Sequence, residues 1–230
     1  MELDRLLRNT NGISGVEMFD KYVIKQNNKE EPTVEESDAV VDDIKYDKEN
    51  ADVSFQIVEI SGKGTGLVAI KKLFPGDLIM FEKPLIVVPD DIYDDLEKVA
   101  KYLDKVVNRL SCPERELFFN LTDCRTPDDP TYLGIFDTND MNFGGDAAIF
   151  PQMARANHSC QPNAEFVTDD IRKIQKLVAI DIIDKGEEIT INYLSMEEEG
   201  TDTKEKRQKF LKKWYGFTCT CRVCSKEVEK

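Results

Sequence analysis

Three cysteines near the end of the sequence have the spacing of a metal site. Cys219, Cys221 and Cys224 crowd into one short segment, and cysteine thiolates are preferred ligands of zinc. A closed structural zinc site is usually tetrahedral and has four ligands. The fourth ligand must therefore come from elsewhere in the chain. The residues alone offer three candidates equally: Cys112, Cys124 and Cys160.

Two other segments carry groups that turn the chain or bind ligands. Residues 62–66 contain three glycines, which permit positive φ and a close approach of a ligand to the backbone. The spacing matches neither the dinucleotide fingerprint nor the phosphate-binding loop, so composition alone favours a tight hairpin. Residues 157–163 are rich in groups that cap turns and are typical of a rigid, hydrogen-bonded loop. His158 is the only histidine, but we do not assign it as a catalytic base.

A third segment, residues 186–193, ends in a tyrosine. Tyr193 follows an apolar run, where a lone tyrosine usually belongs to the core or to an interface. Glu187 and Glu188 precede it, and adjacent strand residues point to opposite faces of a sheet. We therefore interpret both carboxylates as structural or surface groups rather than as an acid–base pair.

The elements that must position these residues are mostly short strands. Apolar periodicity and turn signals predict strands near residues 53–57, 67–70, 78–81, 166–167, 177–183 and 189–193. Helical periodicity covers residues 96–110, a capping box at Ser111 begins a second helix that ends near Leu121, and a basic helix covers residues 203–214. Residues 126–145 are interpreted as a turn-rich loop. Without regular strand–helix alternation, the order predicts a mixed, mostly β fold.

Composition limits the class of protein and its partners. The 230 residues suffice for one domain with appended segments. A formal net charge of -14 disfavours direct nucleic-acid binding and suits a basic partner. No apolar run resembles a secretory signal or a membrane span, so we expect no membrane association and an intracellular protein, in the nucleus, the cytoplasm or both. In such a reducing compartment, clustered cysteines favour metal over disulfides.

The motifs at residues 62–67, 155–163 and 186–193, followed by the cysteine tail, together resemble the SET-domain protein lysine methyltransferases. The resemblance covers about Val53 to Cys224 and is closest to the SET-and-MYND branch or to fungal-type SET proteins, without the cysteine-rich MYND module. It implies a SET fold of short strands and small sheets with a knot-like core. The expected organisation is a flexible acidic tail (1–50), a SET domain (51–195) with a helical insert (91–132), and a post-SET helix with a zinc-binding tail (196–230).

The resemblance also implies the roles of individual residues. Tyr193 is expected to be catalytic and, with Tyr215, to line the channel for the substrate lysine. Cys160 becomes the fourth ligand of one structural zinc ion, beside the three cysteines of the tail. The residues expected to bind S-adenosylmethionine, the methyl donor, are Lys63, Gly64, Thr65, Asn139, Asn157, His158 through its main chain, Tyr193 and Phe217.

The implied reaction is methyl transfer from S-adenosylmethionine to the side-chain amine of a lysine in a protein, histone or non-histone. Keeping that amine neutral at pH 7 costs roughly 4–5 kcal/mol. Repulsion from a sulfonium about 4 Å away, at a dielectric constant near 20, offsets about 4 kcal/mol, so no dedicated base is required. Two alternatives stay open: a non-catalytic, zinc-stabilised protein-interaction module with the SET fold, and the same chemistry on a different amine.

Overall fold

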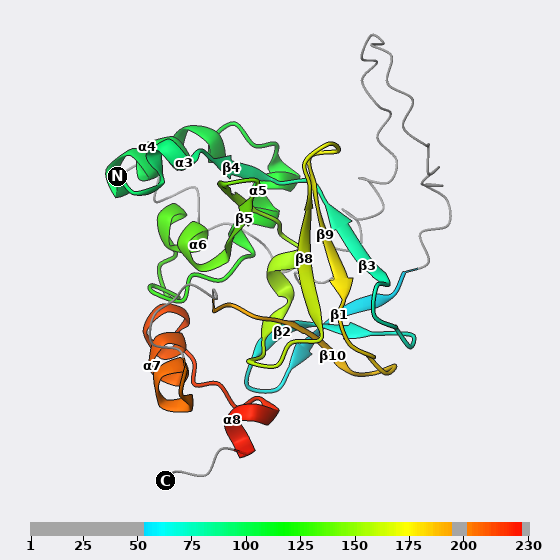
Figure 1. Cartoon of the computed structure of the whole chain (residues 1–230). Helices are drawn as coiled ribbons and strands as arrows, with labels where there is room; N and C mark the ends of the chain where they lie inside the picture. The colour runs from blue at the N-terminus through cyan, green and yellow to red at the C-terminus, as the bar shows by residue number, and fades with distance from the viewer. Residues whose placement is uncertain (1–52, 195–201, 227–230) are drawn as a thin grey trace, which may run out of the picture. The chain divides into compact units, whose positions relative to one another are not determined.

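The computed structural model describes residues 53–194 and 202–226 (Figure 1). The acidic tail predicted for residues 1–50 lies outside this range. The chain divides after Val53, and the helices and strands described here all belong to the part that begins at Ser54. Within the described ranges, no helix has the length and apolar character needed to cross a membrane.

Short strands form three small sheets in the described part of the chain. The first has the order β1-β2-β10-β7, the second β3-β9-β8 and the third β4-β6-β5. The pairs are antiparallel except for β10 with β7, which is parallel. The strands are β1 (Phe55–Ile60), β2 (Gly64–Ala69), β3 (Leu78–Glu82), β4 (Ile86–Val88), β5 (Asp140–Phe143), β6 (Asp146–Ile149), β7 (Asn157–His158), β8 (Ala164–Asp169), β9 (Ile174–Ala179) and β10 (Glu188–Ile191).

One apolar core joins the first two sheets. Leu67 of β2 lies opposite Ile189 of β10, and both side chains are fully buried beside Leu177 of β9. This burial explains the apolar runs in the sequence, since each strand places its large aliphatic residues on the covered face. The register of β10 against β2 and β7 therefore fixes where the chain emerges towards Tyr193.

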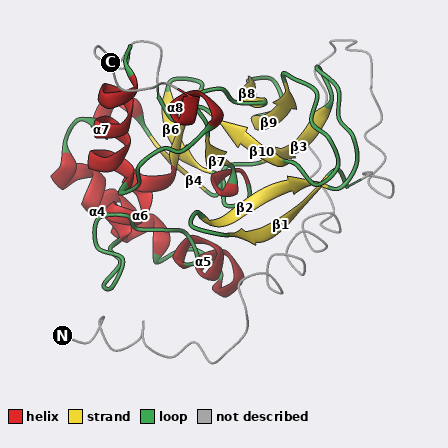
Figure 2. Cartoon of the chain, turned by 90° about the horizontal axis from the view of Figure 1, so that it is seen from below, coloured by secondary structure: helices red, strands yellow, loops and turns green. Residues whose placement is uncertain are grey.

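The helices between β4 and β5 pack around a second core, beside the third sheet (Figures 1 and 2). In α4, Val99, Leu103 and Val107 share one buried face, as their spacing of three and four residues predicts. The helices are α3 (Asp90–Tyr93), α4 (Leu96–Val107), α5 (Cys112–Phe119), α6 (Tyr132–Asn139), the 3-10 helix η1 (Met153–Arg155), α7 (Lys204–Tyr215) and α8 (Arg222–Lys226).

The region between the second predicted helix and the Asn-His segment differs from the prediction. The capping box at Ser111 is confirmed, but the loop predicted for residues 126–145 is wrong in part, because it contains α6 and most of the β5–β6 hairpin. The Thr131 side chain accepts a hydrogen bond from the backbone N–H of Gly134 and starts the helix. A Cβ atom at Gly134 would lie 2.1 Å from a carboxylate oxygen of Asp123, so close packing explains this glycine.

Candidate functional site

Tyr193 lies two residues beyond β10, within a group of aromatic rings. Its ring centroid is 4.9 Å from that of Tyr215 and 5.3 Å from that of His158. Phe217 meets it edge-on at 6.4 Å. Tyr215 is the last residue of α7, and Gly216 then adopts a left-handed conformation that ends the helix. This turn brings both Tyr215 and Phe217 against the tyrosine that the sequence analysis expected to be catalytic.

The hydroxyl group of Tyr193 can accept a hydrogen bond but is poorly suited to remove a proton. Its one hydrogen is donated to the carbonyl oxygen of Ala156 at 2.8 Å, which leaves the oxygen lone pairs for a substrate. Burial raises the pKa of Tyr193 well above its ordinary value, and Tyr215 and Glu188 act in the same direction. The group is therefore a neutral phenol at physiological pH, not a general base.

The glycine motif forms the turn of the β1–β2 hairpin and also makes room for Asn157. Gly62 and Gly64 have φ values of 75° and 72°, which side chains rarely adopt. Gly66 is needed for a different reason: a Cβ atom there would lie 2.3 Å from Ile60 Cδ1 and 2.7 Å from Asn157 Nδ2. The tight hairpin that composition favours is thus confirmed.

Glu188 has a structural role, which is one of the two roles that the sequence analysis gave it. One carboxylate oxygen accepts a hydrogen bond from Asn157 Nδ2 at 3.0 Å, and the other pairs with Lys63 Nζ. Both partners belong to the expected donor-binding set. Glu187, the neighbouring carboxylate, instead accepts the backbone N–H of Asp184 and fits the original interpretation. No local pattern links Glu188 to partners that lie 31 and 125 residues away.

The His158 side chain connects the tyrosine to the cysteines. Its Nδ1 accepts the backbone N–H of Tyr193 at 3.0 Å, so the ring proton must be on Nε2, which lies 3.3 Å from Cys160 Sγ. Burial lowers the pKa of His158 to about 4, and the charges of Arg207 and Lys63 act in the same direction. The ring is therefore neutral with both nitrogens occupied, which agrees with its exclusion as a catalytic base.

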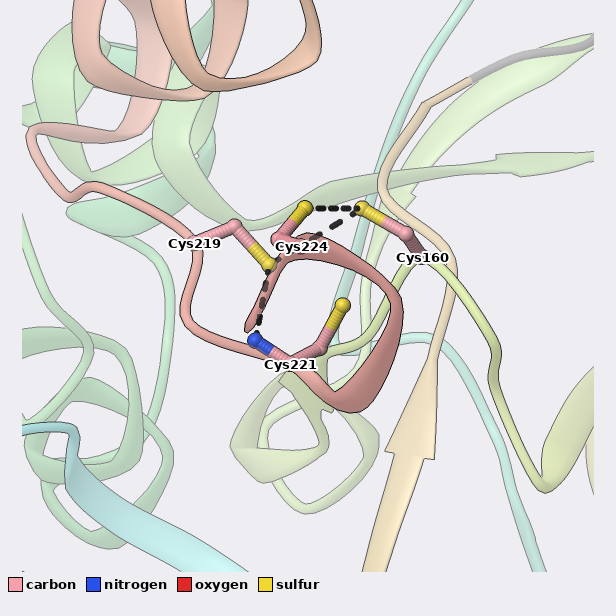
Figure 3. A group of neighbouring side chains, drawn as sticks. All are labelled: Cys160, Cys219, Cys221 and Cys224. Atoms are coloured by element: carbon pink, nitrogen blue, oxygen red, sulfur yellow. Dashed lines mark hydrogen bonds between the residues drawn. The ribbon is translucent and has the colours of Figure 1, made fainter. Parts of the chain in front are cut away.

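The four expected zinc ligands converge in space (Figure 3). The sulfur atoms of Cys160, Cys219, Cys221 and Cys224 all lie within 4.8 Å of one another. Cys160 Sγ is 3.8 Å from Cys219 Sγ and 3.6 Å from Cys224 Sγ. A tetrahedron with zinc–sulfur bonds of about 2.3 Å has edges of about 3.8 Å. The four sulfur atoms are thus spaced to fit a zinc ion. Among the described residues, this is the one group of His, Cys, Asp or Glu side chains whose ligand atoms lie close enough together to hold a metal ion.

The other two cysteines that the sequence left open as fourth ligands lie elsewhere. Cys112 is exposed at the start of α5. Cys124 donates to the carbonyl oxygen of Trp214 and accepts a hydrogen bond from Thr138 Oγ1. Cys160 alone of the three joins the cluster, so the tail is brought to the segment that directly follows β7.

Glu82 supports the segment that leads into Asn157, and the sequence analysis did not identify it. This buried carboxylate accepts the backbone N–H groups of Gln152 at 3.1 Å and Met153 at 3.0 Å. These are the residues at the start of η1, whose end is followed by β7. Burial raises the pKa of Glu82 to about 7, against the opposing effect of the two backbone donors and of Arg155.

Asn139 does not take part in the contacts that join the other predicted residues. It is buried at the end of α6, where its amide donates to the carbonyl oxygens of Thr122 at 2.7 Å and Ile135 at 2.6 Å. Both amide hydrogens are therefore used within this helical region. A structural role explains these contacts without a ligand.

A cleft borders the site and reaches the cysteine tail. The residues that line it include Lys63, His158, Glu188, Cys221 and Arg222. A ligand in this cleft would contact the glycine hairpin, the Asn-His segment and the tail together. Most of the residues that line this cleft are polar or charged, and His158 connects it to the aromatic group around Tyr193.

Comparisons with known proteins agree with this geometry. The family model described as SET domain matches residues 64–194. Histone-lysine N-methyltransferase set5 of Schizosaccharomyces pombe is 31% identical over 180 residues, covering 76% of this chain and 52% of that protein. SET domain-containing protein L678 of Acanthamoeba polyphaga mimivirus is 28% identical over 199 residues, covering 73% of this chain and 76% of that protein.

A solved structure shows the same fold. Rubisco LSMT bound to AdoMet matches with a TM-score of 0.56 and 13% sequence identity, over 91% of this chain and 57% of that one. The chain spans about half the length of the Schizosaccharomyces pombe relative. The family model covers more than half of the chain, and the predicted fold of short strands and small sheets is confirmed. The chain belongs to the SET-domain family.

Proposed function

We propose that this protein transfers a methyl group from S-adenosylmethionine to the side-chain amine of a lysine in a protein substrate. The observation that carries the proposal is the meeting of Tyr193, Asn157 and the glycine hairpin at one site walled by Tyr215 and Phe217. The names of the relatives support it, since one is a histone-lysine N-methyltransferase and the similar solved structure is bound to AdoMet.

The residues that would hold the donor present chemically suitable groups. Lys63, Gly64 and Thr65 form the hairpin turn, Asn157 and the main chain of His158 form the facing strand, and Phe217 supplies an aromatic face for the adenine. When bound, S-adenosylmethionine supplies a methyl group on a positively charged sulfur. Asn139 stays in the proposed set through its side-chain oxygen, because its amide hydrogens are used within its own helical region.

The protein's own contribution to the reaction is alignment and exclusion of water. Tyr193 presents a hydroxyl oxygen with free lone pairs, held in place by its bond to Ala156. Tyr215 packs directly against it, with the ring centroids 4.9 Å apart, so the two rings would form one wall beside the amine. These two rings can orient a lysine amine and keep water from it. Because neither Tyr193 nor His158 is a base, the amine loses its proton to solvent before methyl transfer.

One structural zinc ion completes the proposed site. The thiolates of Cys160, Cys219, Cys221 and Cys224 would hold it, because their sulfur atoms all lie within 4.8 Å of one another. Burial raises the pKa of Cys219 to about 11, so the positive ion would be needed to keep all four sulfurs ionised. The ion would fix the segment after Phe217 to Cys160 and thereby hold the aromatic wall over Tyr193.

The proposal extends to the organisation of the chain and its partners. The acidic tail (1–50), the SET domain (51–195) and the post-SET region (196–230) remain the proposed domains. A net charge of -14 favours a basic protein substrate, among which histones are the proposed class, over direct contact with nucleic acid. The proposed location is the nucleus, the cytoplasm or both, where such a substrate is found.

The deciding experiment follows labelled methyl groups from S-adenosylmethionine. The full chain would be incubated with core histones and with a lysate, and tandem mass spectrometry would locate each modified residue. Label on lysine side chains, lost in the Tyr193→Phe variant and kept in Glu165→Gln, supports the proposal. Label on another amine would support the same chemistry with a different substrate. Donor binding without transfer to any substrate would favour the zinc-stabilised interaction module.

A further inference from the structure

The short helix η1 begins with two backbone N–H groups that its own turn cannot satisfy. These are the N–H groups of Gln152 and Met153, which precede the first carbonyl groups that the turn can offer as acceptors. Glu82, at the end of β3, supplies the acceptor instead. Its Oε2 receives the N–H of Gln152 at 3.1 Å and that of Met153 at 3.0 Å. A buried carboxylate from a distant strand therefore holds the start of η1 in place.

The other end of η1 contacts the tyrosine of the proposed site. The N–H of Ala156 donates to the carbonyl oxygen of Met153 at 3.0 Å, which closes the turn. The carbonyl oxygen of Ala156 then accepts the hydroxyl hydrogen of Tyr193 at 2.8 Å. Met153 and Ala156 are both buried in the first core. A single helical turn within that core therefore connects the carboxylate of Glu82 to the acceptor of the tyrosine.

The hydrogen bond to Ala156 decides where the Tyr193 hydroxyl group presents its lone pairs. A phenol has one hydrogen to donate, so the direction of the lone pairs follows the position of the carbonyl oxygen that receives it. The ring packs against Tyr215 and His158, but these contacts do not set the rotation of the hydroxyl group. A shift of the Ala156 carbonyl group would therefore redirect the lone pairs while the ring stays in place.

We infer that Glu82 is a positioning residue for Tyr193, because it holds the turn whose last carbonyl group receives the hydrogen of the tyrosine hydroxyl group. The inference rests on the proposed function, in which that hydroxyl group orients the substrate amine.

Two substitutions separate the acceptor from the charge of Glu82. Glu82→Leu keeps a branched side chain but leaves the two N–H groups without an acceptor, which is costly for buried groups, so the turn has to move. Glu82→Gln keeps one oxygen that can receive both N–H groups. It also removes the charge that faces Arg155. If the acceptor is what positions the turn, only the leucine variant should disturb Tyr193.

The test is a double-mutant cycle with Tyr193→Phe in the full chain, measured as the rate of methyl transfer to core histones at saturating donor. With Tyr193 present, Glu82→Leu should lower this rate about 10- to 100-fold, since about 1 Å of misplacement can cost about a hundredfold. In the Tyr193→Phe background the hydroxyl group is absent, so the same substitution should lower the rate less than about threefold further. Glu82→Gln should stay within about threefold of the parent, and S-adenosylmethionine affinity, measured by calorimetry, should change less than about threefold in each variant.

Gln175→Leu is the matched control. Gln175 lies opposite Glu82 in the same sheet and is also buried, but its side-chain oxygen accepts a hydrogen bond from Thr168 Oγ1 at 2.8 Å. This substitution also removes a buried polar group, so it should lower the unfolding free energy and leave the rate of methyl transfer unchanged. If Glu82→Leu does not fold, Glu82→Asp replaces it: the shorter carboxylate cannot reach both N–H groups, and the same pattern should appear with a smaller loss of rate.

The outcomes that overturn the inference are distinct. A loss of rate that is equally large in both backgrounds, or that Gln175→Leu shares, would show that Glu82 only supports the fold. A parent-like rate in Glu82→Leu would also overturn the inference and leave the proposed function intact.

A second measurement does not depend on methyl transfer. In protein isotope-labelled at the tyrosine Cζ atoms, the NMR signal that is missing from Tyr193→Phe belongs to Tyr193. This signal should shift in Glu82→Leu and stay in place in Glu82→Gln, and an unshifted signal in the leucine variant contradicts the inference. A parent chain that transfers no methyl group, but whose Tyr193 signal shifts as expected, would overturn the proposed function and leave the link between Glu82 and Tyr193 standing.

Discussion

Substitution of Gly66 by alanine tests whether close packing in the hairpin places Asn157. The added Cβ would lie 2.3 Å from Ile60 Cδ1 and 2.7 Å from Asn157 Nδ2, whereas carbon contacts are comfortable at about 3.5–4.0 Å. Ile60 is half-buried and can rotate its end at a cost of about 1 kcal/mol. Asn157 has to move by roughly 1 Å, which stretches its bonds to Thr65 and Glu188.

The expected cost follows from these contacts. Each weakened hydrogen bond contributes about 0.5–1.5 kcal/mol, and overpacking of a fitted site costs about 1–3 kcal/mol. We expect the Gly66→Ala variant to lose about 2–3 kcal/mol of unfolding free energy, measured by urea denaturation. A misplacement of about 1 Å at a reacting site can cost about a hundredfold in rate, so methyl transfer should fall steeply and donor affinity with it.

Gly76→Ala is the matched control. Gly76 has a φ of 94° with open space around it, so alanine there introduces backbone strain of about 1–2 kcal/mol without touching Asn157. It should lower stability but leave donor affinity unchanged. A Gly66→Ala variant that binds S-adenosylmethionine as tightly as the parent, with the same midpoint in urea, would refute the claim that the missing side chain positions Asn157.

Three further perturbations address the tyrosine, the metal and the buried carboxylate. Tyr193→Phe should reduce methyl transfer about a hundredfold with little change in calorimetric donor affinity; transfer at the parent rate would make the hydroxyl dispensable. Metal analysis should find one zinc per chain, lost in Cys160→Ser and retained in Cys112→Ser; normal zinc in the first variant would exclude Cys160 as a ligand. Because the folded pKa of Glu82 is about 7 and thus above its unfolded value, the folded state binds this proton more tightly. As the pH rises from 4.5 to 7, the parent should therefore lose up to about 3 kcal/mol of unfolding free energy relative to Glu82→Gln. Curves of unfolding free energy against pH that run parallel for the two proteins would contradict that pKa.

Local patterns in the sequence predicted those features that depend on neighbouring residues. The capping box at Ser111 and the strand periodicity around Leu67 and Ile189 are properties of short windows, and the structure contains both. The cysteine tail was recognisable for the same reason, although only the family resemblance selected Cys160 from three candidates.

Features that depend on distant partners could not be predicted from periodicity. Helix α6 was missed because Gly134 weakens its helical pattern in the sequence, and no local pattern reveals the buried Asp123 that packs against this glycine. The contacts of Glu188 could not be predicted because its partners come from other segments of the chain. In both cases a side chain from another part of the fold determines which residue type is tolerated.

The two contacts of the His158 ring make it a built-in spectroscopic probe. The sequence contains one histidine, so in a uniformly nitrogen-labelled protein its imidazole nitrogens give a single pair of NMR signals that needs no further assignment. Nε2 faces Cys160 and Nδ1 receives the backbone N–H of Tyr193. Ionisation of the cysteine on metal binding strengthens the first contact, so one resonance follows metal loading while the other follows the position of the tyrosine backbone. A titration with zinc would thus report, on a single ring, whether occupancy of the cysteine cluster and order at Tyr193 change together.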